Sequence, residues 1–196
     1  MPNRKSPSKP YHHGDLRAAL LRSAVNAITE LGVAATSVRE VARRAGVTHP
    51  AASYHFGDRS GLLTAVAVEG YRMLGEALAT VQERTGSFLE VGVAYVEFAI
   101  EHPAHFDVMY QPGLYDHDDP DLQAAKAETA ALLYGSRDAD DEQLAFGVAA
   151  WSLVHGLATL WRNEALPAQL GDDPLEITRL VARHLRTEGV RPEPRL

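Results

Sequence analysis

The amino-acid sequence predicts an all-α protein with two parts, an N-terminal three-helix unit that contains a helix-turn-helix and a larger C-terminal helical unit. Three observations predict this fold. Apolar residues recur at helical spacing through most of the chain, no segment alternates as a half-buried strand does, and residues 36–56 divide into two short helices around a glycine. We expect about nine helices in total.

The chain begins with a predicted flexible arm and one long helix. Residues 1–11 are basic and rich in Pro and Ser, which is typical of a solvated arm. The first helix is predicted over residues 13–31 and ends at Gly32, because glycine accepts the left-handed conformation found at helix ends. Its apolar side chains, which we expect to pack on the next two helices, are Leu16, Leu20, Ala24, Ala27, Ile28 and Leu31.

The helix-turn-helix follows directly. Ser37 is placed to cap the second helix, with Glu40 three residues later as the reciprocal partner of a capping box. Gly46 ends this helix, and Thr48 opens the third one, where Pro50 lies in the first turn and its missing N–H is tolerated. The side chains predicted to be buried here are Val38, Val41, Ala42, Ala45, Val47 and Phe56.

The rest of the sequence predicts six more helices. Residues 59–83 form a helix of about 25 residues, roughly 37 Å long, which is enough to join two domains. Gly86, the His102-Pro103 pair and the Pro- and Asp-rich loop 111–121 interrupt the helical pattern beyond it. The later helices are predicted over residues 87–101, 103–110, 120–134, 141–164 and 174–188.

Composition limits the class of protein. The chain has 196 residues, enough for one large domain or two small ones, and it has no cysteine. The lack of cysteine excludes disulfides, thiolate metal sites and cysteine nucleophiles, and it fits a reducing compartment. No apolar run reaches the roughly 18 residues that cross a bilayer, and the start lacks the apolar core of a secretion signal. We therefore expect a cytoplasmic protein.

Charge is divided unevenly along the chain. Residues 1–60 carry nine Lys/Arg and four Asp/Glu, net +5, and residues 61–196 carry ten and twenty-two, net −12, which sum to the −7 of the whole chain. A basic first part on an acidic second part favours local attraction of a polyanion such as DNA.

The sequence also resembles a known family. Two runs, HHGDLRAALLRSA and TSVREVARRAGVTHPAASYHFGDRSGLL, resemble the DNA-binding domain of TetR-type (tetracycline-repressor-like) transcriptional regulators, and EFAIEHPAHFDVMY and WSLVHG resemble the branch with a Trp-His-Gly C-terminal domain. The resemblance implies a homodimeric repressor that a small molecule releases from a palindromic operator, with no enzymatic activity and no cofactor. It divides the chain into an arm (1–11), a DNA-binding domain (12–58) and a ligand-binding and dimerisation domain (59–190), with the dimer formed by the two C-terminal helices.

The predicted DNA contacts gather around the third helix. The Thr48 hydroxyl and the helix dipole suit a phosphate, His49 suits a purine edge, and Pro50 with Ala51 suits thymine methyl groups. The family usually has an aromatic residue where Ser53 stands, so either Ser53 or the neighbouring Tyr54 makes that contact. The full predicted set is Ser37, Arg39, Thr48, His49, Pro50, Ala51, Ser53, Tyr54, His55 and Arg59.

The predicted effector pocket lies in the second part. Trp151 and His155 are four residues apart and so share a helix face. Aromatic side chains with one histidine favour an apolar or aromatic ligand that carries a polar group. The full predicted set is Phe88, Tyr95, Phe98, Phe106, Met109, Tyr110, Trp151 and His155.

Two alternatives remain open. One is a DNA-binding regulator without a small-molecule inducer, controlled by a protein partner or always active. The other is a divalent metal site, for which the sequence offers His102, His105, Asp107, Asp116 and His117, although Pro103 breaks the helical spacing that a histidine pair prefers.

Overall fold

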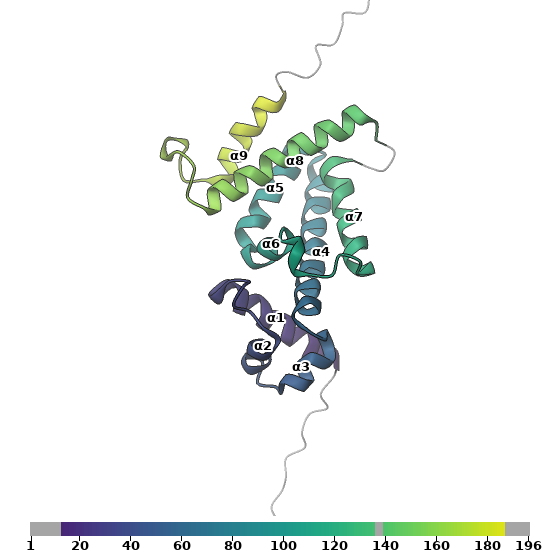
Figure 1. The fold of residues 1–196 in the computed structure, drawn as a ribbon. Helices are drawn as coiled ribbons and strands as arrows, with labels where there is room; N and C mark the ends of the chain where they lie inside the picture. The colour runs from purple at the N-terminus through teal and green to yellow at the C-terminus, as the bar shows by residue number, and fades with distance from the viewer. Residues whose placement is uncertain (1–12, 136–138, 187–196) are drawn as a thin grey trace, which may run out of the picture.

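The described part of the chain is almost entirely helical. The structure is a computed structural model and describes residues 13–135 and 139–186. Within these ranges it contains nine α-helices, three short 3₁₀ helices and no strand, as the sequence predicts (Figure 1). The predicted arm, residues 1–11, lies outside the described residues.

The first three helices form a small bundle, the head, at the bottom of Figure 1. They are α1 (His13–Leu31), α2 (Val38–Arg44) and α3 (His49–Phe56). The predicted core is confirmed except at its edges: Leu16, Ala45 and Val47 are only partly buried, and Leu31 is 47% exposed. Leu31 is the last residue of α1 and stands beside the exposed Gly32 turn, so no neighbouring helix covers it.

Helix α4 (Arg59–Thr85) leaves the head and runs upward as the axis of the second unit, the body (Figure 1). Its 27 residues correspond to roughly 40 Å at 1.5 Å per residue. Gly86 ends it in the left-handed conformation with φ of 60°. Helix α4 packs against α1 and α3 in the head and against helices of the body. A displacement of α4 therefore moves the two units relative to each other.

Five further helices complete the body. They are α5 (Phe88–Glu101), α6 (Pro103–Met109), α7 (Pro120–Tyr134), α8 (Asp141–Arg162) and α9 (Pro174–Ala182). Helices α5, α6 and α7 pack on α4, while α8 crosses the top of the body on α5 and α7, with α9 beside it (Figure 1). Helix α6 also contacts α1, so it lies at the junction of head and body.

The last helix is shorter than predicted. The α-helix ends at Ala182 and continues as the 3₁₀ helix Arg183–Arg186, and the predicted end at residue 188 lies outside the described residues. The other predicted helices are confirmed to within about two residues at each end.

The surface of helix α8 is more apolar than the sequence analysis predicted. The sequence analysis predicted no apolar run that could cross a bilayer. By length and composition, however, α8 is such a helix, and only 28% of its 18-residue apolar stretch is buried. Ser152, His155 and Thr159 interrupt the apolar run without adding charge, so residues 143–161 contain no Asp, Glu, Lys or Arg. One face of α8 packs on α5 and α7, and the rest exposes apolar side chains: Leu144, Phe146, Val148 and Leu160.

Candidate DNA-binding surface and effector cavity

Helix α2 is capped at its start by Ser37, whose Oγ accepts a hydrogen bond from the Glu40 amide at 3.2 Å. The predicted reciprocal half of the capping box is wrong. The Glu40 carboxylate instead accepts hydrogen bonds from Arg43 at 2.6 Å and Arg44 at 2.8 Å, because charged guanidinium donors one turn away compete successfully with a backbone N–H. These two bonds lower the pKa of Glu40 to about 2. Arg39, on the same helix, is exposed and forms no ion pair with the described part of the chain.

Helix α3 has one buried side and one open side. Thr48 caps it, with its hydroxyl accepting from the Ala51 amide at 3.4 Å. Ala52 is fully buried and Phe56 is 8% exposed, so both belong to the head core. Tyr54, in contrast, is 83% exposed, although a tyrosine ring in a folded protein usually packs against its neighbours.

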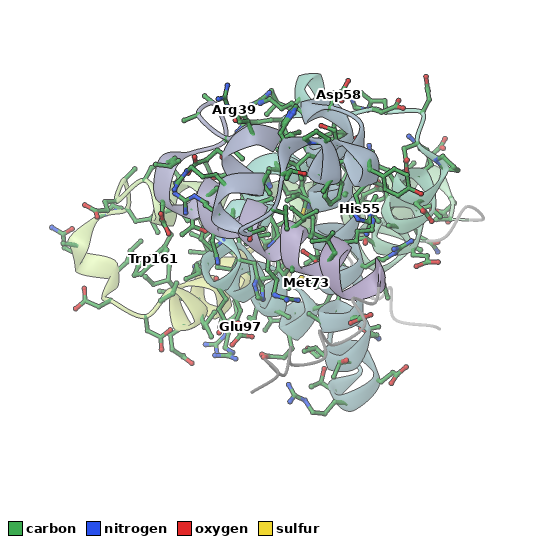
Figure 2. All side chains as sticks on the ribbon, turned by 90° about the horizontal axis from the view of Figure 1, so that it is seen from below. Arg39, His55, Asp58, Met73, Glu97 and Trp161 are labelled. Carbon is green, nitrogen blue, oxygen red and sulfur yellow. The ribbon has the colours of Figure 1, made fainter. Side chains whose placement is uncertain are left out.

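The remaining predicted α3 residues lie around this open side. His49 and Pro50 are exposed, while Ala51, Ser53 and His55 are half-buried. Ser53 Oγ and His49 Nε2 are 3.4 Å apart, and the ring of His55 meets Tyr54 edge-on at 5.5 Å. Figure 2 views the head from below, with Arg39 near its upper edge and His55 to the right. The exposed aromatic side chain on α3 is thus Tyr54, at the position next to the one that the family pattern predicts.

Arg59, at the first position of α4, is turned toward the protein. Its Nε donates to the Thr36 carbonyl at 2.9 Å, and its Nη2 donates to the Val33 carbonyl at 2.8 Å. Both acceptors lie in the loop between α1 and α2, which leads into the Ser37 cap. Arg59 therefore ties the start of α4 to the helix-turn-helix.

A cavity of about 330 Å³, here called the tyrosine cavity, lies in the body and is partly open to solvent. Its wall comes from α4, the end of α6, the loop after α6, α7 and α8. The lining residues are Tyr71, Met109, Tyr110, Pro112, Tyr115, Lys126, Thr129, Ala130, Leu133, Tyr134 and Trp151.

Hydrogen bonds tie α4 to the other walls of this cavity. The carbonyl of Met109 accepts from the hydroxyl of Tyr71 at 3.3 Å and from that of Tyr115 at 2.7 Å. The Thr129 hydroxyl on α7 lies 3.0 Å from the backbone carbonyl of Tyr71. Gly70 lets α6 approach closely, since a Cβ there would stand 2.6 Å from the Met109 sulfur. Tyr71 is therefore both a cavity wall and a bonded residue of the helix that joins head and body.

A polar aromatic group lies behind the cavity. The hydroxyls of Tyr95 and Tyr110 share a hydrogen bond of 2.8 Å, and the Tyr95 hydroxyl lies 2.8 Å from His155 Nδ1. Burial raises the pKa of Tyr95 and of Tyr110 above the usual tyrosine range, and burial lowers the pKa of His155. Phe106 stacks on His155 with ring centroids 5.3 Å apart. At neutral pH the group is uncharged.

A second cavity, of about 250 Å³, lies between α5, α8 and α9 and is almost wholly apolar. Leu133 and Trp151 line both cavities and so form the wall between them. The indole N–H of Trp151 is buried and makes no hydrogen bond within the described part of the chain. Phe88, another lining residue, is 42% exposed beside Phe146.

The eight predicted pocket residues fall into separate places. Three of them, Met109, Tyr110 and Trp151, line the tyrosine cavity, and Phe88 lines the second cavity. Tyr95, Phe106 and His155 form the layer behind the tyrosine cavity, and Phe98 packs on His102 at 5.0 Å. The sequence analysis did not identify Tyr71, Tyr115, Thr129, Tyr134 or Lys126 as cavity residues. No local sequence pattern marks these residues, because they are far apart in the chain and come together only in the folded protein.

Two of the residues considered as metal ligands form ion pairs or hydrogen bonds with other residues. His105 Nε2 lies 2.9 Å from a Glu69 carboxylate oxygen, and Asp107 pairs with Arg162 at 2.7 Å. Within residues 13–135 and 139–186, no three His, Asp or Glu side chains come together as metal ligands would. The five residues considered for a metal therefore do not form one cluster.

Comparisons with known proteins agree on the family. The family model described as "Tetracyclin repressor-like, C-terminal domain" matches residues 88–187, and the model described as "Bacterial regulatory proteins, tetR family" matches residues 20–66. The first of these contains both C-terminal stretches on which the sequence resemblance rested. A search of curated proteins gave no match.

Solved structures share this fold over most of the chain. A protein of unknown function from Rhodococcus sp. RHA1 is 30% identical, with 91% of this chain and 97% of that chain covered and a TM-score of 0.76. A TetR family transcription regulator from Marinobacter aquaeolei VT8 is 17% identical, with coverage of 88% and 95% and a TM-score of 0.64. The multidrug binding protein EbrR, solved with imidazole, is 22% identical, with coverage of 92% and 96% and a TM-score of 0.56. Together with the helix-turn-helix of the head, these matches show that the chain belongs to the TetR family of bacterial transcriptional regulators, which are DNA-binding proteins and not enzymes.

Proposed function

We propose that this chain is a cytoplasmic, homodimeric repressor that leaves a palindromic operator when a small molecule fills the tyrosine cavity. Residues 12–58 act as the DNA-binding domain and residues 59–190 as the sensing and dimerisation domain. The observation that carries the proposal is the position of α4, which begins against the helix-turn-helix through Arg59 and forms a wall of the cavity through Tyr71.

In this proposal α3 enters the major groove, with its open side on the DNA. Thr48 and the first amides of α3 meet a phosphate, and His49, Pro50 and Ala51 face base edges. Tyr54 serves as the aromatic contact to the DNA backbone, supported by its 83% exposure on the open side of α3. Ser37 and Arg39 contact the DNA from α2, while Ser53 and His55 support the contact surface of α3.

Two heads are needed for a palindrome. They must lie one DNA turn apart, ~34 Å, or a multiple of it. The exposed apolar side chains of α8, with Leu180 of α9 at 47% exposure, provide a self-complementary face of the kind that two-fold dimers bury. We propose that α8 and α9 pair with the same helices of a second subunit.

The operator is released because α4 forms part of the cavity wall and is also bonded to the head. A ligand that contacts Tyr71 competes with the present arrangement of Tyr71, Tyr115 and the Met109 carbonyl. Moving Tyr71 moves α4, and α4 carries the head through the Arg59 bonds. Because the coupling is reciprocal, ligand and operator must weaken each other's binding by the same factor.

The DNA-binding proposal is tested by selecting bound fragments from random double-stranded DNA, which should yield a palindrome. Replacing Tyr54 with Ala should leave the thermal midpoint unchanged and weaken operator binding by roughly tenfold, the loss of about one hydrogen bond to a phosphate. Replacing the exposed Gln82 with Ala, at the far end of α4, is the matched control and should change neither quantity. Recovery of no preferred sequence at low salt would overturn the proposal.

The inducer proposal is tested by titrating ligands that bind the purified protein against a labelled operator fragment. A ligand that fills the tyrosine cavity should lower operator affinity. If ligands bind there and operator affinity stays constant, the regulator has no inducer of that kind, and the alternative of a partner-controlled or always-active regulator applies.

A further inference from the structure

We infer that the effector is a monocarboxylic acid with a compact apolar body, its carboxylate held by Lys126 and its body held in the tyrosine cavity. This inference rests on the proposed function, because it takes that cavity as the sensing site. It specifies the chemical class of the ligand, which neither the fold nor the family determines.

The first observation is the position of Lys126. It is half-buried on α7, lines the cavity, and places its ammonium 6.0 Å from the centroid of the Tyr71 ring. It makes no ion pair or hydrogen bond with any residue of the described ranges. The residues three and four positions away on α7 are Leu122, Gln123, Thr129 and Ala130, so no carboxylate on its own helix can reach it.

The second observation is that Lys126 lacks the carboxylate partner that three arginines of the body have. Residues 61–196 carry ten Lys/Arg against twenty-two Asp/Glu, so carboxylates are in excess. Three arginines of the body pair with such carboxylates: Arg72 with Asp121, Arg162 with Asp107 and Arg179 with Glu90. A cation left without a carboxylate at the wall of an apolar cavity is therefore available to an anion from outside.

The third observation is the chemistry of the remaining wall. Lys126 is the only charged residue among the described residues that line the tyrosine cavity. Burial raises the pKa of Tyr71 and of Tyr110 above the usual range, so their hydroxyls remain neutral at physiological pH. No carboxylate among the described lining residues can form an ion pair with a ligand ammonium, and a single lysine balances a single negative charge. The wall thus favours a monoanion over a cation, a neutral molecule or a dianion.

Size limits the apolar body. A volume of about 330 Å³ is at the low end of the range for small-molecule sites. Aromatic rings from Tyr71, Tyr110, Tyr134 and Trp151 supply most of the apolar contact. An acid of about six to twelve carbons, straight-chain or carrying one aromatic ring, matches this space.

The experiment uses the full-length protein and a panel of such acids, each paired with the primary amide of the same carbon skeleton. Binding is measured by titration calorimetry. At least one acid should bind, and its amide should bind about 10- to 100-fold more weakly, the effect of losing one charge-assisted hydrogen bond. Lys126→Met should bring acid and amide to the same affinity, whereas the control Arg84→Met, an exposed arginine near the end of α4, should preserve the preference.

Several outcomes would overturn the inference: no acid of the panel binds, the amide binds as tightly as its acid, or the preference survives in Lys126→Met. Operator binding without ligand is measured on the same variants, because it reports the proposed function separately. If the protein selects a palindrome but ignores the acids, only the ligand class is wrong. If an acid binds through Lys126 and operator affinity does not change, the inferred ligand class is right and the inducer function is wrong.

Discussion

The double hydrogen bond of Arg59 yields a sharp prediction. Replacing Arg59 with Ala removes donors from the carbonyls of Val33 and Thr36, residues that are 8% and 1% exposed. A hydrogen bond from a charged donor contributes about 1.5–3 kcal/mol, but the half-buried site lets water replace part of this. We expect a loss of about 2 kcal/mol for the head. Operator affinity should fall as well, because the loop that these bonds hold leads into the cap of α2.

The assay combines urea unfolding with operator binding at several salt concentrations. If Arg59 acts only through the loop, the salt dependence of the variant has the wild-type slope, since no phosphate contact is lost. A phosphate contact predicts the opposite, a slope reduced by about one unit with stability unchanged. That second result would refute the reasoning from the hydrogen bonds. Arg39→Ala serves as the control, because this exposed residue is expected to change the slope and leave stability intact.

Three further predictions concern the body. Gly147→Ala places a Cβ 2.4 Å from the Tyr134 Cα and should destabilise the fold by about 2 kcal/mol or more in thermal unfolding, whereas Gly156→Ala on the same helix meets no atom of its subunit within 4 Å and should not. Since burial lowers the pKa of His155 from 6.5, the unfolded state binds more protons, so stability should fall as pH drops below 6.5, and His155→Gln should lose this component in unfolding titrations. Leu160→Glu should yield monomers in analytical ultracentrifugation, and a dimer of wild-type strength would contradict the proposed α8 interface.

Local signals in the sequence predicted most of the fold. Ser37, Thr48 and Gly86 act within one turn of chain, so capping hydroxyls and a left-handed glycine are readable without knowledge of the tertiary structure. Pro103 marked the break between α5 and α6 for the same reason.

Interactions between distant residues were not readable. The sequence shows a positive charge at Arg59 but not the carbonyls, 23 and 26 residues earlier, that it binds. Tyr71 lies 38 residues from the Met109 carbonyl that it contacts, so its part in the cavity wall appears only once α6 is folded against α4. Glu40 fits a capping box by spacing, and the two arginines that follow it on α2 decide its actual partners.

Leu133 and Trp151 separate the two cavities of the body, and this separation limits the length of a ligand that fits in the tyrosine cavity. A shorter side chain in place of Leu133 would open the wall between two neighbouring hollows of about 330 and 250 Å³ and create a longer channel that ends near α9. In the proposed effector site, the length of the ligand would then change through a single substitution, with the head untouched.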